Sequence, residues 1–213
     1  MKVKEIIVHR VNSLELLAKL DKNFGAEIDV RYHENDLVLD HDPFNHHNLP
    51  KPQKLEDFLQ NYKLSGHLIV NIKSEGVEKA AIELMNKYKI KNWFFLDLSM
   101  PYFVRFANYA KSGDIKGFGV QNLAVRFSEE ETIDYALNFA GRARWVWVDC
   151  FTKMPLDDKI YQKLKAAQFK ICLVSPELHG HNLQYIAKFK EQLYNMEIDA
   201  ICTKHPDLWL NNI

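Results

Sequence analysis

The fold is decided by residues 6–10, IIVHR, which are followed by GAEIDV at 25–30 and LVLDHD at 37–42. Each stretch is a short apolar, largely β-branched run with polar or charged side chains at or near its end. This pattern is typical of a strand that is buried along its length and presents its functional residues where it ends.

Two acids and two histidines accompany these strands. Because alternate side chains of a strand point to opposite faces, Glu27 and Asp29 share one face and can bind one cation together. His9 ends the first run and His41 ends the third, so both imidazoles are expected near the acids. A divalent cation that neutralises a phosphate, with one imidazole to take a proton and another to return it, suits phosphoryl transfer.

Strand-like and helix-like segments alternate along the whole chain. Periodicity predicts helices at 13–23, 54–62, 75–88, 101–112, 128–140, 156–167 and 182–195. It predicts strands at 3–9, 25–31, 67–72, 92–98, 115–120, 143–149, 169–174 and 198–203. Continuous apolar runs suit parallel strands that are covered on both faces. We therefore expect an α/β fold, a single (β/α)8 TIM barrel over residues 1–213.

Residues 32–53 interrupt the alternation and read as a loop with one short strand, LVLD. This extension after the second strand would carry His41 over the barrel mouth. His46 and His47 lie in its polar part and are expected to be solvated.

Polar residues follow the predicted strands, at the end where such barrels build their active face. They are His9, Arg10, Glu27, Asp29, Asn71, Lys73, Asp97, Gln121, Asp149, Glu177 and Lys204. Trp145 and Trp147 precede Asp149. We expect one of these tryptophans to pack under the helices and Trp147 to form a wall of the substrate pocket.

The order HR, GAEIDV and LVLDHD resembles the signature of the glycerophosphodiester phosphodiesterases, a family of the phosphatidylinositol-phospholipase-C-like barrel superfamily. LIVNIK at 68–73 resembles the third strand of that family, and DAICTKHPDLW at 199–209 resembles its last strand and tail. The resemblance covers residues 6 to 209, almost the whole chain.

The resemblance implies a phosphoric diester hydrolase that acts on a glycerophosphodiester or a related glycerol-phosphate linkage. His9 and His41 would serve as general acid and base, in an order that the sequence leaves open. The metal, Mg²⁺ or Ca²⁺, would bind Glu27, Asp29 and Asn71. Arg10 and Lys73 would offset the charge of the phosphate.

Two positions depart from the family pattern. The third metal ligand is usually Glu or Asp, whereas this chain has Asn71, which either coordinates as a neutral ligand or leaves the phosphate to Lys73 and Arg10. HRVNS at 9–13 replaces a motif that has glycine after HR and an acid close behind, which alters the floor of the pocket.

Composition narrows the classes of partner. Lys plus Arg equals Asp plus Glu, at 28 each, so no basic excess is present to bind nucleic acid. We find no long apolar run and no signal-peptide pattern, and we expect no transmembrane segment and a cytoplasmic location. Cys150, Cys172 and Cys202 fall in apolar runs without CxxC spacing and are expected to be buried thiols.

Three alternatives stay open. The chain could be a catalytically degenerate barrel that only binds a phosphate ester, with Asn71 as the mark of lost catalysis. It could instead be an isomerase or aldolase that uses Lys204. Because the extension is short, the pocket is either more open than in relatives or completed by a second copy of the chain in a homo-oligomer.

Overall fold

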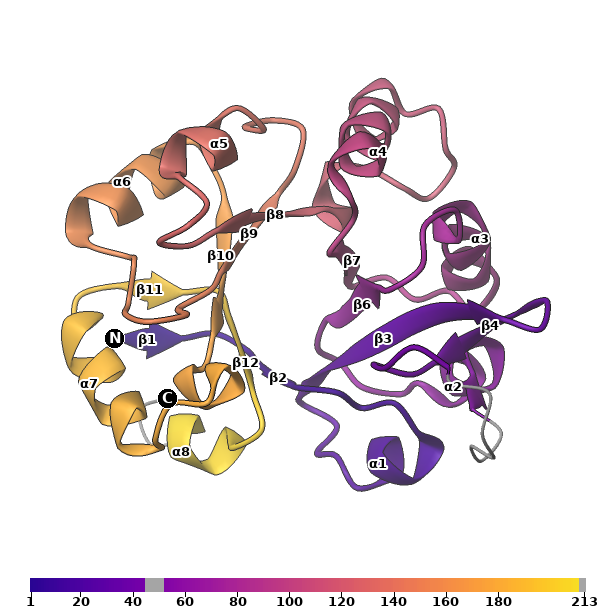
Figure 1. Cartoon of the computed structure of the whole chain (residues 1–213), viewed down its shortest axis with the longest axis horizontal. Helices are drawn as coiled ribbons and strands as arrows, with labels where there is room; N and C mark the ends of the chain where they lie inside the picture. Colours follow the sequence, from indigo (N-terminus) through magenta and orange to yellow (C-terminus); the bar gives the residue numbers. More distant parts are fainter. Residues whose placement is uncertain (45–51, 211–213) are drawn as a thin grey trace.

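A computed structural model of the chain describes residues 1–44 and 52–210. Its centre is a parallel sheet that curls into a barrel (Figure 1). The barrel strands, in order around the sheet, are β2 (Ile6–Val8), β3 (Gly25–His33), β6 (Leu68–Ile72), β7 (Trp93–Leu96), β8 (Ala124–Phe127), β9 (Trp145–Val148), β10 (Lys170–Val174) and β12 (Ala200–Thr203), and β12 pairs with β2. The junction between β7 and β8 is a parallel bridge from Phe95 to Leu123.

Helices follow the strands and cover the outside of the sheet (Figure 1). They are α1 (Leu14–Ala18), α2 (Leu55–Asn61), α3 (Glu78–Lys87), α4 (Met100–Ser112), α5 (Ile133–Leu137), α6 (Asp158–Ala166), α7 (Gln184–Gln192) and α8 (Pro206–Leu210), with 3-10 turns η1 (Val120–Asn122) and η2 (Pro176–His179). The side chains of Ser13 and Asp157 accept hydrogen bonds from the first turns of α1 and α6, as helix N-caps do. The predicted α/β barrel is confirmed.

The extension after the second barrel strand also has the predicted character. Strand β3 continues past the barrel and pairs antiparallel with β4 (Asp36–Leu39), which pairs with β5 (Gln53–Lys54). Outside the barrel, β1 (Lys2–Val3) pairs with β11 (Glu197–Ile198).

The predicted fifth strand was wrong. Residues 115–119 form a loop in which Gly117 has a φ of 75°, Val120 begins η1, and β8 lies at 124–127 instead. Gln121 therefore belongs to η1 and does not end a strand. The apolar run 115–120 contains two glycines, which weaken a strand, whereas LAVRF at 123–127 has the β-branched and aromatic residues that stabilise one.

The barrel interior is closed by apolar side chains from seven strands: Ile7, Ile69, Phe94, Leu96, Ala124, Trp145, Trp147, Cys172, Val174, Ala200 and Cys202. Trp145 and Trp147 both belong to this interior, because residues two apart on a strand point to the same face. The expectation that one of them packs under the helices was wrong. Cys150, Cys172 and Cys202 are buried free thiols, as predicted.

At the end of the barrel where the strands begin, Gly25 and Asp199 make close contacts with neighbouring strands. A Cβ added to Gly25 would lie 2.3 Å from the carbonyl oxygen of His67, so only glycine fits between β3 and β6. Burial opposes ionisation of Asp199, but hydrogen bonds from the Ile171 N–H and from Lys165 and Lys4 lower the pKa of this carboxyl below its ordinary value.

None of the helices in the described residues is long and apolar enough to span a membrane.

Candidate active site

Five of the predicted residues meet where the first three barrel strands end. His9 follows β2, Glu27 and Asp29 lie in β3, Asn71 lies in β6, and Lys73 comes directly after β6. In the parallel register of β3 and β6, Asp29 is paired with Asn71. Glu27, Asp29 and Asn71 are buried, with exposed fractions of 1%, 0% and 8%.

Glu27 is held by hydrogen bonds to both of its carboxylate oxygens. The backbone N–H of Arg10 donates to Oε2 at 2.7 Å, and Nδ2 of Asn71 donates to Oε1 at 3.0 Å. Burial and the nearby charge of Asp29 nevertheless raise the pKa of Glu27 above its ordinary value. Arg10 has a φ of 56°, a left-handed conformation that is uncommon for a residue with a side chain and that aims its N–H at Glu27.

Asp29 and Asn71 each have a buried oxygen without a hydrogen-bond partner, Oδ1 in both residues. The other Asp29 oxygen, Oδ2, accepts from Nδ2 of Asn12 at 2.8 Å, and Oδ1 of Asn12 accepts from the Asp29 N–H at 2.9 Å. Buried polar atoms are normally satisfied, so two unpartnered oxygens on paired residues of adjacent strands fit the binding of a hard cation.

Among the described residues, no three His, Cys, Asp or Glu side chains converge as a metal-binding group. A cation here would therefore need the amide oxygen of Asn71 in addition to Glu27 and Asp29. The chemistry of this donor set, two carboxylates and one carbonyl-type oxygen, suits Mg²⁺ or Ca²⁺.

His9 lies beside the acids, with Nε2 3.8 Å from Oε2 of Glu27 and Nδ1 buried without a hydrogen-bond partner. Burial, followed by the positive charges of Arg10, Lys204, His41 and Lys73, lowers the pKa of His9 to about 3. The imidazole is therefore neutral near pH 7 and able to accept a proton.

His41 is brought to the same region by the extension. Nη2 of Arg31 donates to the His41 carbonyl oxygen at 2.7 Å, and Nη1 donates to the Lys73 carbonyl oxygen at 3.2 Å, which ties the extension to the end of β6. Nδ1 of His41 lies 2.7 Å from a carboxylate oxygen of Asp42. The side chain of His41 is 37% exposed, so this imidazole faces solvent more than His9 does. His46 and His47 lie outside the described residues.

Lys73 begins a row of alternating charges across the barrel mouth. Its Nζ lies 3.6 Å from Oδ1 of Asp29 and 3.3 Å from Oδ2 of Asp97. Asp97 also accepts from Nε of Arg126 at 2.7 Å, and Nη1 of Arg126 lies 2.6 Å from Oδ2 of Asp149. Asp97 has a φ of 61°, so its carboxylate is placed between the two cations by a strained backbone.

The row of charges ends at Asp149, whose side chain is buried. Oδ1 of Asp149 accepts from Nε1 of Trp147 at 3.0 Å and lies 3.0 Å from Nε2 of His179. Trp147 is 5% exposed, so it lies in the upper layer of the barrel interior. Glu177 accepts from Thr203 at 2.6 Å and from the Lys204 N–H at 3.1 Å, which ties η2 to the end of β12.

Sequence reasoning missed Asn12 and Arg126. Asn12 stands in the HRVNS segment, where the sequence showed only that a family acid was absent, and its two contacts with Asp29 depend on how the chain folds back after β2. Arg126 was missed because the fifth strand was predicted too early. The alternation of LAVRF, with a polar residue inside an apolar run, is the signal that could have found it.

Known structures share this fold. No protein-family model and no curated protein matches the sequence. A structure described as a candidate glycerophosphodiester phosphodiesterase from Galdieria sulphuraria matches with a TM-score of 0.68 at 15% identity, over 99% of this chain and 97% of that one.

A glycerophosphodiester phosphodiesterase from Agrobacterium tumefaciens C58 matches with a TM-score of 0.65 at 13% identity, over 97% of both chains. A glycerophosphoryl diester phosphodiesterase from Parabacteroides distasonis matches with a TM-score of 0.60 at 13% identity, over 97% of this chain and 85% of that one. At these identities the likeness establishes the fold.

Proposed function

We propose that this chain is a phosphoric diester hydrolase for glycerophosphodiesters or a related glycerol-phosphate linkage. The observation that carries the proposal is the placement of His9 beside Glu27, Asp29 and Asn71 at one end of the barrel, where His41 lines a pocket together with Arg10. The similar structures whose names include this activity have the same fold along nearly their whole length, which supports the same choice of substrate class.

Glu27, Asp29 and Asn71 would hold a divalent cation, Mg²⁺ or Ca²⁺, which supplies positive charge to a phosphate oxygen when bound. The two unpartnered oxygens of Asp29 and Asn71 support this assignment. The raised pKa of Glu27 supports it too, because two buried like charges favour a cation beside them. Asn71 contributes no charge, so we expect weaker binding than an all-carboxylate site would give.

Lys73 and Arg10 would bind the phosphate oxygens directly. The side chain of Lys73 is 18% exposed and that of Arg10 is exposed, so both ammonium and guanidinium can reach a ligand at the mouth. Trp147 would lie below the ligand as part of the pocket floor. The phosphodiester resists attack by its negative charge, and these two cations offset that charge.

His9 and His41 would move the protons. An attacking hydroxyl loses its proton to one imidazole as its oxygen bonds to phosphorus. The bond from phosphorus to the leaving oxygen breaks, and the other imidazole gives that oxygen a proton. A substrate hydroxyl next to the phosphodiester is one attacker and would give a cyclic phosphate; water is the other and gives a monoester.

The test is turnover of glycerophosphodiesters by His9→Ala and His41→Ala. Each substitution should lower kcat by about 100-fold or more, because each removes one proton-transfer group. His33→Ala is the matched control, since His33 lies on the hairpin of β3 and β4 and has no role in this mechanism. Full activity in either His9→Ala or His41→Ala would contradict the proposal.

A barrel that binds phosphate esters without cleaving them is the second candidate. It is favoured by one observation: the Lys73 ammonium lies 3.6 Å from Asp29, so this lysine can offset part of the charge that a cation would otherwise neutralise. Binding of glycerol phosphate that a chelator leaves unchanged, without turnover of any diester, would select this alternative.

A further inference from the structure

Two surface hollows meet at Leu64, in the loop that precedes β6. The larger has a volume of about 360 Å³ and lies between α1, the turn after it and this loop. The smaller, of about 260 Å³, lies between the same loop and the loop that precedes β7. Because Leu64 lines both hollows, they form one continuous strip on the surface.

The larger hollow is mostly apolar. Its lining includes the aliphatic side chains of Leu14, Leu17, Ala18, Leu20 and Leu64. Leu16, also on α1, is 45% exposed, so this helix presents leucine to the outside as well as to the core. An apolar hollow of this kind suits an amphiphile, whose apolar part is buried while its charged part stays at the rim.

Four exposed lysines border the strip. Lys22 and Lys63 line the larger hollow, and Lys89 and Lys91 line the smaller one. None of the described residues that line either hollow carries a carboxylate. The chain as a whole has no net charge, so these lysines form a local positive patch.

Acids near the strip do not cancel this charge. Glu15 on α1 pairs with Lys19, and Glu56 on α2 pairs with Lys87. Asp21 is exposed and adds one negative charge beside four positive ones. The strip therefore attracts an anionic partner.

Lys89 has a backbone conformation that glycine adopts more readily. It follows α3 with a φ of 56°, at the left-handed position where helices often end in glycine. A residue with a side chain is less stable there than glycine. What this position gains over glycine is an ammonium group at the rim of the smaller hollow.

All four charges of the strip come from lysine, which distinguishes a lipid surface from a protein partner. Protein–protein interfaces are enriched in arginine and depleted in lysine. The lysine ammonium is a point charge on a flexible stem, which suits phosphate groups without fixed positions, such as the headgroups of an anionic membrane. Leucines beside lysines therefore favour a lipid surface.

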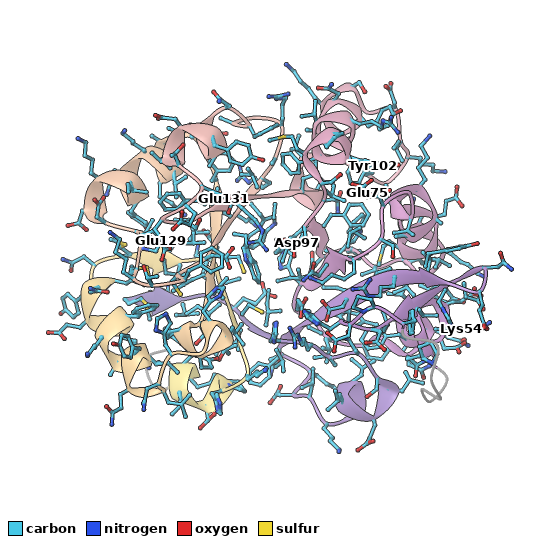
Figure 2. All side chains as sticks on the ribbon, viewed as in Figure 1. Lys54, Glu75, Asp97, Tyr102, Glu129 and Glu131 are labelled. Atoms are coloured by element: carbon cyan, nitrogen blue, oxygen red, sulfur yellow. The ribbon has the colours of Figure 1, made fainter. Side chains whose placement is uncertain are left out.

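We propose that this strip binds a membrane that contains anionic phospholipid, with its leucines against the acyl chains and its four lysines against the phosphates. The lysines precede β3, β6 and β7, at the end of the barrel opposite to the strand ends that carry His9 and Asp29. Figure 2 shows Asp97, at the barrel mouth, near the centre of the view, whereas α1 lies at the lower edge (Figure 1). The bound chain would keep its candidate active site open to water.

The test is sedimentation of the full chain with vesicles of phosphatidylcholine alone and of equal parts of phosphatidylcholine and phosphatidylglycerol. The chain should bind the second kind and not the first. Lys63→Gln and Lys91→Gln should each lower the partition coefficient roughly fivefold, as expected for one lysine near an anionic surface. Lys159→Gln is the matched control, because Lys159 is exposed on α6, on the opposite side of the view from α1 (Figure 1).

Two further variants separate binding from folding. Lys89→Gly relieves the left-handed conformation, so its Tm should be equal to or above that of the unsubstituted chain while its partition coefficient falls roughly fivefold. Leu16→Gln keeps a good helix former on α1 and removes an exposed apolar side chain, so it should also weaken binding to the anionic vesicles.

The readout is binding, so it does not depend on the proposed phosphodiesterase function. Equal sedimentation with and without phosphatidylglycerol would overturn the proposal, as would losses in Lys63→Gln and Lys91→Gln no larger than in Lys159→Gln. Absence of vesicle binding, with binding of an amphipathic peptide of leucine and glutamate that Lys63→Gln weakens, would assign the strip to an acidic protein partner instead. Binding that needs phosphatidylglycerol and the strip lysines supports the proposal.

Discussion

Replacing Asn71 by Asp tests the cation site, because it adds one negative charge at nearly constant size. In the structure, Nδ2 of Asn71 donates to Oε1 of Glu27 at 3.0 Å. An aspartate would face that oxygen with a like charge. Two unit charges at this distance repel by about 5 kcal/mol at an effective dielectric constant of about 20. Uptake of one proton by the pair would reduce this value, so it is an upper limit.

For a chain of this size, a loss of 5 kcal/mol corresponds to a fall in Tm of roughly 10 to 20 °C. In the presence of a chelator, we expect the Tm of Asn71→Asp to lie below that of the unsubstituted chain by no more than this amount. Mg²⁺ or Ca²⁺ should then raise the Tm of Asn71→Asp by more than that of the unsubstituted chain, because a bound cation stabilises only the folded state. Calorimetric titration should show at least about tenfold tighter cation binding, since an added carboxylate strengthens such sites.

Asn122→Asp is the matched control. Asn122 is also a buried amide, which donates to the Trp93 carbonyl oxygen at 2.9 Å and accepts from the Gly119 N–H at 3.0 Å, away from the proposed cation site. This variant should lose stability without regaining it in Mg²⁺ or Ca²⁺. Equal cation affinity in the unsubstituted chain and in Asn71→Asp would refute the role of Asn71 as a ligand.

Three further predictions concern other parts of the molecule. Asp97→Asn keeps a residue that tolerates the left-handed φ of 61°, but it frees Lys73 to pair fully with Asp29. Cation affinity measured by calorimetry should therefore fall by roughly 5- to 10-fold. An unchanged affinity would contradict this role of Asp97. Asp199→Asn should cost about 1 to 2 kcal/mol at pH 7. Because the folded-state pKa of Asp199 is depressed, the stability that its carboxylate contributes is present above the unfolded pKa of about 3.9 and is lost as pH falls through the folded pKa. Denaturant titrations should therefore give free energies of unfolding for the unsubstituted chain and Asp199→Asn that converge in acid. A difference that stays constant with pH would contradict this account. Gly25→Ala should destabilise the fold by roughly 2 kcal/mol or more by chemical denaturation, since the new methyl group meets a backbone carbonyl at 2.3 Å; a neutral effect would contradict the tight approach of β3 to β6.

Most of the barrel could be predicted from the sequence because each strand is a short apolar run and each helix shows the helical spacing of its apolar side chains. The positions of His9, Glu27, Asp29, Asn71 and Lys73 followed directly, since parallel strands end at the same side of the sheet. Their roles stay predictions, but their proximity did not require knowledge of tertiary packing.

The seam between β7 and β8 could not be predicted in the same way. The apolar content of 115–120 suggested a strand, and only the glycines and the competing run at 123–127 argued against it. The consequence was larger than a shift of boundaries, because the place of Arg126 in the row of charges depends on where that strand lies. The positive φ of Asp97 was equally hidden, since no local pattern marks an aspartate that leaves its strand in a left-handed conformation.

Asn12 shows a different limit. Its side chain binds Asp29 with both ends of its amide, a pairing between residues 17 positions apart. Composition and spacing identify the donor and acceptor but not the contact. Such contacts need the backbone geometry of the loop after β2.

The central claim is that the chain cleaves a glycerophosphodiester with the help of a divalent cation. The most direct test is phosphorus NMR of the protein incubated with glycerophosphodiesters, first with Mg²⁺ or Ca²⁺ and then with a chelator. The account predicts a new monoester or cyclic-phosphate resonance that the chelator abolishes. No new resonance for any of the diesters, with the cation present, would contradict it.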